Sequence, residues 1–424
     1  MTTTINNEQK KLNVPNLRFP EFQGEWEKCK LGTLTTKVGS GSTPKGGNAV
    51  YTSAGHCFVR SQNVGMGYLI LDEIAHINDV IHQKHKATEL KEDDVLLNIT
   101  GASIGRTAIA TKEIEGGNVN QHVCIIRANS KVNPKFLCNY IQTKKIQNYI
   151  QSLQTGGSRE GLNFEQIRSF PISLPNIAEQ NKITQLLDKL NERIATQNKI
   201  IEDLKKLKCA IIDEVFCSPK QREPNRRFER CTEPLSTYKM KDFCFRITDK
   251  NKENKCSLVL TIAAQYGLVD QESFFNKSVA SENLTGYYIL NKGDFAYNRS
   301  YSSGYAWGAV KRLDNYSEGV LSTLYICFRA DESIVNSDYL SYYFESSKWH
   351  KEVSDISGEG ARNHGLLNIS VSDYFNTEHR FATMSEQKRI ASMLNAIVIK
   401  EQNAIELGKL YSKQKQYLLR QMFI

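Results

Sequence analysis

KITQLLDKLNERIATQNKIIEDLKKLKCAIIDEVF, residues 182–216, is the stretch that decides the architecture of this chain. A related stretch, RIASMLNAIVIKEQNAIELGKLYSKQKQYLLRQMF, ends at Phe423. A shift of 207 positions (386 minus 179) places Glu179 on Glu386 and Phe216 on Phe423, and the span between needs no gap. We therefore interpret the chain as an internal duplication.

Apolar side chains recur along both stretches at steps of three or four, which is typical of the seam of a coiled coil. A helix of this length is roughly 50 Å long at about 1.5 Å per residue, and its single apolar stripe needs a partner. The duplicate is the nearest candidate. The predicted helix-pair interface consists of Ile183, Leu187, Leu190, Ile194, Ile201, Leu204, Ile211, Ile390, Leu394, Ile397 and Leu418.

The order of the segments predicts that the two helices are antiparallel. The first helix leads from the first unit toward the second, and the second helix packs on it most simply by running back. The expected fold class is α+β, with two similar globular domains separated by a pair of long antiparallel coiled-coil helices. The alternative is two separate amphipathic helices, each packed on its own domain.

The duplication also predicts the domain boundaries. PNRRF at 224–228 repeats PNLRF at 15–19, so the repeat begins before the helices. The expected parts are a flexible N-terminal arm (1–16), a first globular unit (17–178), a first long helix (179–217), a linker (218–224), a second unit (225–384) and a second long helix (385–424).

Within the first unit, short apolar runs separated by turns predict strands near 56–61, 94–100, 106–111 and 122–128. Residues 133–151 change to a helical period, and FPISLP at 170–175 predicts a last strand. The second unit repeats this plan at shifts between 200 and 203, for example with YICFRA at 325–330 on VCIIRA at 123–128. We therefore expect one fold with different loops.

Composition favours a globular chain in a reducing compartment. Hydrophobic residues make up 40% and charged residues 24% of 424 residues, and the net charge of +9 favours polyanionic partners. The ten cysteines are scattered without a C-x-x-C pair, which indicates neither a zinc site nor a disulfide framework. No signal peptide or run of about 18 apolar residues is visible, so we expect a cytoplasmic protein without a membrane segment.

Catalytic and ligand motifs are weak. GASIG at 101–105 matches the G-x-S-x-G nucleophile elbow, but the elbow needs a helix after Ser103 and a strand is predicted there. GSGSTPKGG at 39–47 lacks the residue order of a phosphate-binding loop. His82 and His85 lack a third metal ligand and are interpreted as exposed histidines. We expect no catalytic residue and no metal.

Polar, basic and aromatic side chains gather in the predicted loops of both units. Arg, Asn and Gln can read base edges in the major groove, and Ser and backbone amides hold phosphates. The first-unit candidates for DNA binding are Lys45, Arg60, Gln62, Asn63, Arg106, Asn120, Gln121, His122, Ser158 and Arg159. The second-unit candidates are Arg299, Tyr301, Ser302, Ser303, Tyr305, Trp307, Arg362, Asn363 and His364.

Taken together, these features resemble the specificity subunit of type I restriction-modification enzymes over nearly the whole chain. The resemblance rests on the repeated EQxxI…L motif that starts at Glu179 and Glu386, W-x-x-x-x-L-G at 26–32 and G-x-T-P at 41–44. LNITGASIGRTAI and NQHVCIIR also look like such subunits. The second unit departs from the pattern, because Leu235 stands for the tryptophan and no G-x-T-P loop follows.

The resemblance implies that 17–178 and 225–384 are target-recognition domains, each reading one half of a split, asymmetric DNA target. It implies that the helices set the gap between the half-sites and dock two modification subunits, which restriction subunits join. S-adenosylmethionine, ATP and Mg are expected on these partner subunits, and no cofactor is expected on this chain. The alternative is a non-catalytic coiled-coil adaptor whose end domains bind protein. A self-sufficient DNA methyltransferase is disfavoured because its signatures are missing.

Overall fold

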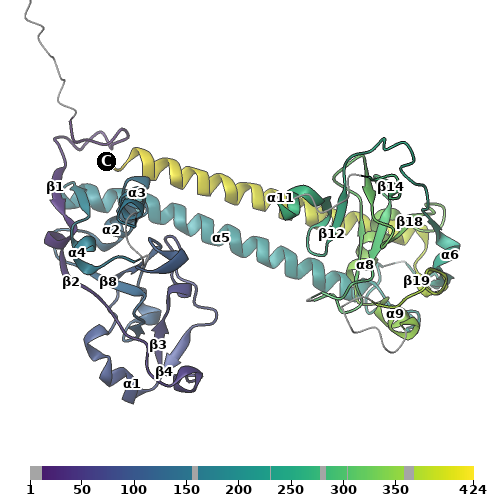
Figure 1. Cartoon of the computed structure of the whole chain (residues 1–424), viewed down its shortest axis with the longest axis horizontal. Helices are drawn as coiled ribbons and strands as arrows, with labels where there is room; N and C mark the ends of the chain where they lie inside the picture. The colour runs from purple at the N-terminus through teal and green to yellow at the C-terminus, as the bar shows by residue number, and fades with distance from the viewer. Residues whose placement is uncertain (1–11, 155–160, 230, 277–282, 303, 358–366) are drawn as a thin grey trace, which may run out of the picture. The chain divides into compact units, whose positions relative to one another are not determined.

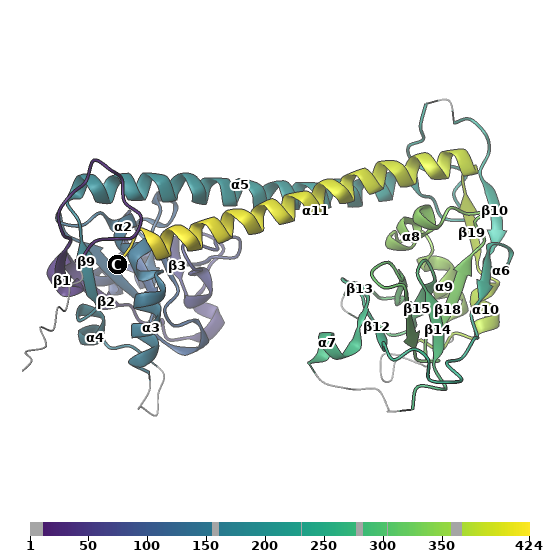
Figure 2. The ribbon, with the colours of Figure 1, turned by 90° about the horizontal axis from the view of Figure 1, so that it is seen from above.

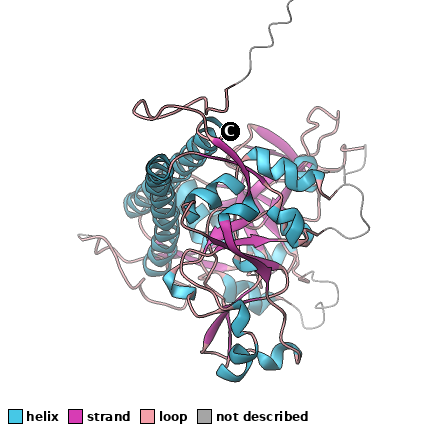
Figure 3. Cartoon of the chain, turned by 90° about the vertical axis from the view of Figure 1, so that its left-hand side faces the viewer, coloured by secondary structure: helices cyan, strands magenta, loops and turns pink. Residues whose placement is uncertain are grey.

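A computed structural model describes residues 12–154, 161–229, 231–276, 283–302, 304–357 and 367–424 of the chain (Figure 1). The chain forms two compact units. Unit 1 comprises residues 1–197 and 407–424, and unit 2 comprises residues 198–406. The chain mixes helices with short strands, as the colours of Figure 3 show, and both kinds of element occur in each unit.

In unit 1 the strands come before and between short helices along the chain. The first long helix begins after the last of these strands. Its strands are β1 Glu27–Lys30, β2 Thr35–Ser40, β3 His56–Val59, β4 Ala75–Ile77, β5 Val95–Asn98, β6 Thr107–Ile109, β7 Asn118–Val119, β8 Val123–Ala128 and β9 Pro171–Leu174. Its helices are α1 Asp79–Lys84, α2 Pro134–Ile141, α3 Lys144–Ser152, α4 Phe164–Arg168 and the start of α5 Ile177–Val215.

A four-stranded antiparallel sheet, ordered β2-β8-β5-β6, forms the centre of unit 1. Successive side chains of a strand point to opposite faces, so an apolar run without alternation needs cover on both sides. In β5, Val95 and Leu97 belong to the core under α2, and Leu96 belongs to a second core on the other face. The uninterrupted apolar sequence of this strand follows from that double cover.

Unit 2 follows a similar order of elements, and its antiparallel pair β12–β13 lies beside α7 (Figure 2), where unit 1 has the antiparallel pair β3–β4 before α1. Unit 2 also has the further strand β14, which pairs with β17. Its strands are β10 Ser236–Lys239, β11 Cys244–Arg246, β12 Leu260–Ala263, β13 Gly267–Asp270, β14 Tyr288–Asn291, β15 Phe295–Asn298, β16 Ala309–Arg312, β17 Glu318–Leu321, β18 Ile326–Ala330 and β19 Glu378–Phe381. Its helices are α6 Met240–Phe243, α7 Gln271–Phe275, α8 Ser337–Glu345, α9 His350–Ile356, α10 Val371–Phe375 and the start of α11 Met384–Gln421.

The central sheet of unit 2 has the corresponding order β11-β18-β15-β16. Here too the two faces divide one strand, with Phe295 and Tyr297 in one core and Ala296 in another. Each unit also carries a two-stranded antiparallel pair directly before its long helix, β1 with β9 in unit 1 and β10 with β19 in unit 2. The central sheets and these pairs therefore share one plan.

The Glu-Gln motif at the start of α5 ties three segments of unit 1 together. Glu179 is buried, and its carboxylate accepts two hydrogen bonds of 2.8 Å from the guanidinium of Arg18. The Oε1 atom of Gln180 accepts from the backbone N–H of Asn133 at 2.8 Å, and its Nε2 donates to the carbonyl of Lys131 at 3.2 Å. A buried charge needs a partner, which explains why Glu179 and Arg18 occur together.

Unit 2 contains the same contacts at the start of α11. The guanidinium of Arg227 donates to both carboxylate oxygens of Glu386 at 3.1 and 2.6 Å. Gln387 accepts from the N–H of Asn336 at 2.7 Å and donates to the carbonyl of Ile334 at 3.2 Å. The repeated motifs of the sequence therefore hold equivalent positions in the two units.

Each long helix begins in one unit, and its last turn belongs to the core of the other. Phe423, just after α11, packs in unit 1 against Phe136 and Tyr140, with ring centres 5.1 and 5.7 Å apart. Phe216, just after α5, packs in unit 2 against Tyr339 and Tyr343, at 4.9 and 5.7 Å. Within each unit, the early part of one helix therefore shares a core with the late part of the other.

The residues predicted for the helix-pair interface differ in burial. Buried are Ile183, Leu187, Leu190, Ile390, Leu394, Ile397 and Leu418, while Ile194, Ile201, Leu204 and Ile211 are half-buried. Near the end of α5, Ile212 is the buried residue instead of Ile211. Many of the buried residues pack on the globular parts of their units as well as on the second helix.

Two predictions of local structure need correction. The predicted helix over 133–151 is two helices, because Thr143 begins α3 with its hydroxyl bonded to the carbonyl of Tyr140 at 2.7 Å. In the predicted flexible arm, Asn13 is buried and bonds the carbonyl of Trp26 through its amide. That bond holds the last residues of the segment on unit 1. The domain boundaries themselves stay predictions.

No helix in the described part of the chain is long and apolar enough to cross a membrane.

We predict that Phe423→Ala destabilises unit 1 by about 3–5 kcal/mol, because it removes a buried ring from an aromatic core. Hydrogen exchange should show lost protection in α2, although α2 lies far from residue 423 in the sequence. The control Leu410→Ala changes a side chain on the same helix that is 58% exposed, and should cost under about 0.5 kcal/mol. Equal loss of protection in unit 2, or none in α2, would contradict this account of the core.

Candidate nucleic-acid interface

The loop between β5 and β6 is joined to one other segment of unit 1 through one buried side chain. The amide nitrogen of Asn98, the last residue of β5, donates to the carbonyl of Ser61 at 2.8 Å and to the hydroxyl of Ser103 at 3.2 Å. These bonds bring the segment that contains Arg60 and Gln62 to the turn that precedes Arg106.

The turn between β7 and β8 contacts the same loop between β5 and β6. His122 lies with its Nδ1 atom 2.6 Å from the hydroxyl of Thr100, and its Nε2 atom lies 3.1 Å from the Nε2 atom of Gln121. The hydroxyl of Thr43 donates to Oε1 of the same Gln121 amide. The side chains of three separate loops are therefore connected by hydrogen bonds.

Gly41 explains how the G-x-T-P loop reaches this place. A Cβ atom at residue 41 would lie 1.7 Å from the carbonyl oxygen of Val119, a distance that no side chain permits. Only glycine lets the loop rest on the end of β7, where Thr43 meets Gln121. We call residues 41–45, 60–63, 100–106 and 120–122 the unit 1 loop cluster.

The candidates predicted in the unit 1 loop cluster differ in how far their side chains are available. Lys45, Gln62, Arg106 and Gln121 are exposed, and Arg60 and His122 are half-buried. Asn63 is buried, accepts from the N–H of Arg60 at 3.0 Å and donates to the carbonyl of Ile70 at 2.9 Å. Asn120 is buried and accepts from the N–H of His122 at 3.1 Å. These two amides shape the loops and do not face a ligand.

In unit 2 the loop between β15 and β16 occupies the equivalent place. Arg299 does not extend into solvent, because its guanidinium donates to the carbonyls of Ile369 and Leu324 at 2.9 Å each. Tyr301 and Ser302 are exposed, so they are the described candidates of this loop with free surface.

Two aromatic candidates of unit 2 are half-buried. Trp307 packs against the core, and its carbonyl accepts from the hydroxyl of Tyr297 at 2.8 Å. The ammonium of Lys311 lies 5.7 Å from the centre of the Tyr305 ring. Burial lowers the pKa of Lys311 and raises the pKa of Tyr305. The predicted residues Ser158, Arg159, Ser303, Arg362, Asn363 and His364 lie outside the described residues.

The GASIG segment is a turn between two strands, as expected. Gly101–Ser103 is a single 3₁₀ turn, and the strand β6 follows it. Gly101 and Gly105 have φ angles of +69° and +86°, which favour glycine. The hydroxyl of Ser103 accepts from Asn98, so it stabilises the loop. The strand–turn–helix context of a nucleophile elbow is not formed at this segment.

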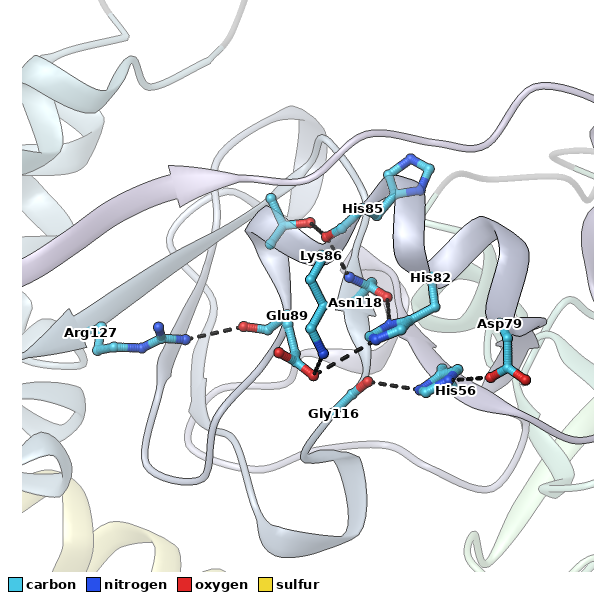
Figure 4. A network of polar contacts seen from close by, with 10 residues as sticks. His56, Asp79, His82, His85, Lys86, Glu89, Gly116, Asn118 and Arg127 are labelled. Carbon is cyan, nitrogen blue, oxygen red and sulfur yellow. Dashed lines mark hydrogen bonds and ion pairs between the residues drawn. The ribbon is translucent and has the colours of Figure 1, made fainter.

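The interpretation of His82 as an exposed histidine is wrong (Figure 4). His82 is buried, stacks on His56 with ring centres 3.7 Å apart, and its Nδ1 atom lies 2.7 Å from the amide oxygen of Asn118. His56 contacts the carbonyl of Gly116 at 3.0 Å and the carboxylate of Asp79 at 2.8 Å. The stack packs α1 on β3. In the described residues, no group of three or more His, Cys, Asp or Glu side chains is placed so that it could hold a metal ion.

Three residues whose side chains link the loops of unit 1 were absent from the predicted set: Thr43, Asn98 and Thr100. Thr43 is the third residue of the G-x-T-P motif, and Asn98 and Thr100 belong to LNITGASIGRTAI. Both motifs were visible in the sequence. The contacts that bring them together were not visible, because they depend on the geometry of loops whose contacting residues are about 80 and about 20 positions apart in the sequence.

Two units with matched central sheets and different loops after β5 and β15 define a protein with a duplicated scaffold that carries two different sets of loops. Residues 23–206 match the family model of the type I restriction modification DNA specificity domain. The resemblance to the specificity subunits of type I restriction-modification enzymes is therefore confirmed.

Two curated relatives match part of the chain. It is 22% identical over 211 residues to a Methanocaldococcus jannaschii protein assigned as the type I restriction enzyme MjaX specificity subunit, covering 49% of each chain. It is 26% identical over 139 residues to the type I restriction enzyme EcoBI specificity subunit of Escherichia coli, covering 31% of this chain and 28% of the relative. The chain thus matches about half or less of the length of these relatives.

Solved structures match nearly the whole chain. The S subunit of a type I restriction-modification system from M. genitalium has a TM-score of 0.55 and 12% identity, covering 97% of this chain and 99% of its own. A chain from a study of complex assembly and conformational transition of the type I R-M system has a TM-score of 0.53 and 15% identity, covering 93% and 96%. At these identities the likeness shows the fold.

Proposed function

We propose that this chain is the DNA specificity subunit of a type I restriction-modification complex. Each unit reads one half of a split, asymmetric DNA target, with 17–178 and 225–384 as target-recognition domains. The observation that carries the proposal is the combination of a repeated scaffold with different loops. The buried pairs Glu179–Arg18 and Glu386–Arg227 recur, whereas the loop side chains at equivalent strand ends do not.

The exposed residues of the unit 1 loop cluster support DNA as the ligand. Gln62 and Gln121 carry amides of the kind that pair with base edges, and Lys45 and Arg106 carry charges of the kind that contact phosphates. The net charge of +9 favours association with a polyanion. In unit 2, Tyr301 and Ser302 have the exposure that a DNA contact needs.

The two long helices set the gap between the half-sites and dock the modification subunits. Their nearly equal lengths, 39 residues for α5 and 38 for α11, support a spacer function. At about 1.5 Å per residue each is close to 58 Å long, enough to span the roughly 34 Å repeat of B-DNA. Exposed apolar side chains such as Leu207, Ile399 and Leu410 support a partner surface on these helices.

The chemistry belongs to the partner subunits in this proposal. Two modification subunits carry S-adenosylmethionine and transfer the methyl group, and restriction subunits supply cleavage with ATP and Mg. This chain contributes recognition and spacing and binds no cofactor. A cytoplasmic location fits this role and remains part of the proposal.

The alternative function is a coiled-coil adaptor whose end domains bind protein. We predict instead that the purified chain with its modification subunits binds duplex DNA with an affinity that falls steeply with salt, because phosphate contacts release counterions. Binding measured between 50 and 200 mM KCl should weaken by about tenfold or more. Weak binding that is insensitive to salt would favour the adaptor.

We also predict that inserting four residues into α5 after Lys199 changes the gap between the half-sites, while both half-site sequences stay the same. Four residues add about 6 Å, slightly more than one helical turn. Selection of bound duplexes from a random library measures both properties at once. Altered half-sites with an unchanged gap would contradict the spacer role. Substituting exposed Lys199 by Ala, without an insertion, is the matched control.

A further inference from the structure

The amide of Gln121 is exposed, but it is held on both of its polar atoms. Thr43 donates its hydroxyl to Oε1, and the Nε2 atom lies 3.1 Å from Nε2 of His122. His122 is held in turn by the hydroxyl of Thr100, 2.6 Å from its Nδ1 atom. A flexible surface side chain therefore has a fixed orientation, which is a property of residues that recognise a ligand.

The hydrogen-bonding capacity of this amide is only half used. A glutamine amide offers two acceptor lone pairs and two N–H donors. Within the described part of the chain, Thr43 uses one position on one atom and His122 uses one position on the other. With respect to the described residues, one acceptor position and one N–H donor therefore remain unused on neighbouring atoms of the planar amide. If the Gln121 amide is flipped and each hydrogen bond exchanges its donor and acceptor, one donor and one acceptor of the amide again remain unused.

An adjacent donor and acceptor on a planar amide match one base edge in the major groove. Adenine presents N7 as an acceptor and N6 as a donor, and Asn or Gln pairs with both. We propose that Gln121 is a specificity-determining residue that reads an adenine in the half-site bound by unit 1. In this proposal, which rests on the proposed function, Thr43 and His122 are positioning residues.

The described residues of unit 2 contain no equivalent of the hydrogen-bonded set Thr43, Gln121 and His122. The shift of 202 that aligns β8 with β18 places Thr323 at the position of Gln121 and Leu324 at the position of His122. Leu324 is 66% exposed, and its carbonyl accepts from Arg299. No G-x-T-P loop precedes it. The adenine contact is therefore a property of one half-site only, and the other half-site is an internal control.

The test is selection of bound duplexes from a random library by the full chain assembled with its modification subunits. Wild type should select adenine at one position of one half-site. Gln121→Glu should replace adenine by cytosine at that position, because a carboxylate accepts from cytosine N4 and cannot donate to N7. The change in preference should be about tenfold or more, with the gap and the other half-site unchanged. The matched control Gln83→Glu changes an exposed glutamine on α1 and should select the wild-type motif.

The positioning role has its own test. Thr43→Val removes the hydroxyl that orients the amide, so adenine should remain preferred but with several-fold weaker discrimination. Thr43→Ser keeps the hydroxyl and should restore the wild-type preference. A role of Thr43 in folding alone would not be rescued in this base-specific way. Equal melting temperatures of the variants check that the fold is intact.

The outcomes separate this inference from the proposed function. A split wild-type motif that Gln121→Glu leaves unchanged at every position would overturn the adenine contact and leave the proposed function standing. A first half-site without any adenine would overturn it as well. A wild-type complex that selects no motif at all would instead contradict the proposed function itself.

Discussion

The structure depends on the burial of each long helix's end in the core of the unit where the other helix begins. Phe423 fills a space among the aromatic rings of α2 in unit 1, and Phe216 does the same against α8 in unit 2. Neither half of the sequence therefore contains all of its own core.

A second set of contacts is repeated in the central sheets of both units, whereas the loops that follow the strands differ. Bidentate pairs such as Asp94–Arg127 and Asp294–Arg329 stabilise the central sheets of both units with carboxylates that are almost fully buried. The residues of the loops that follow β5 and β15 take no part in these ion pairs. One loop is organised by Thr100 and the other by Arg299. The proposed reading of two different half-sites requires this combination of a constant scaffold with different loops.

The sequence predicted the scaffold better than the site. The period of the long helices and the shift of 207 are strong because they extend over many residues, and the strands near β5 and β8 are marked by uninterrupted apolar runs. Burial of single polar residues was not predictable. Asn63 and Asn120 share a residue type with base-reading amides, but their own loops use them. His82 lies in a polar segment, yet the stack with His56 buries it. Such outcomes depend on contacts between distant loops.

In the proposed function, this chain selects a split DNA target for methylation. The most direct test is single-molecule methylome sequencing of cells with and without the gene, in the presence of a matching modification subunit. The account predicts methylation at one split motif that disappears on deletion. An unchanged methylome, with the modification subunit active through another specificity protein, would contradict it.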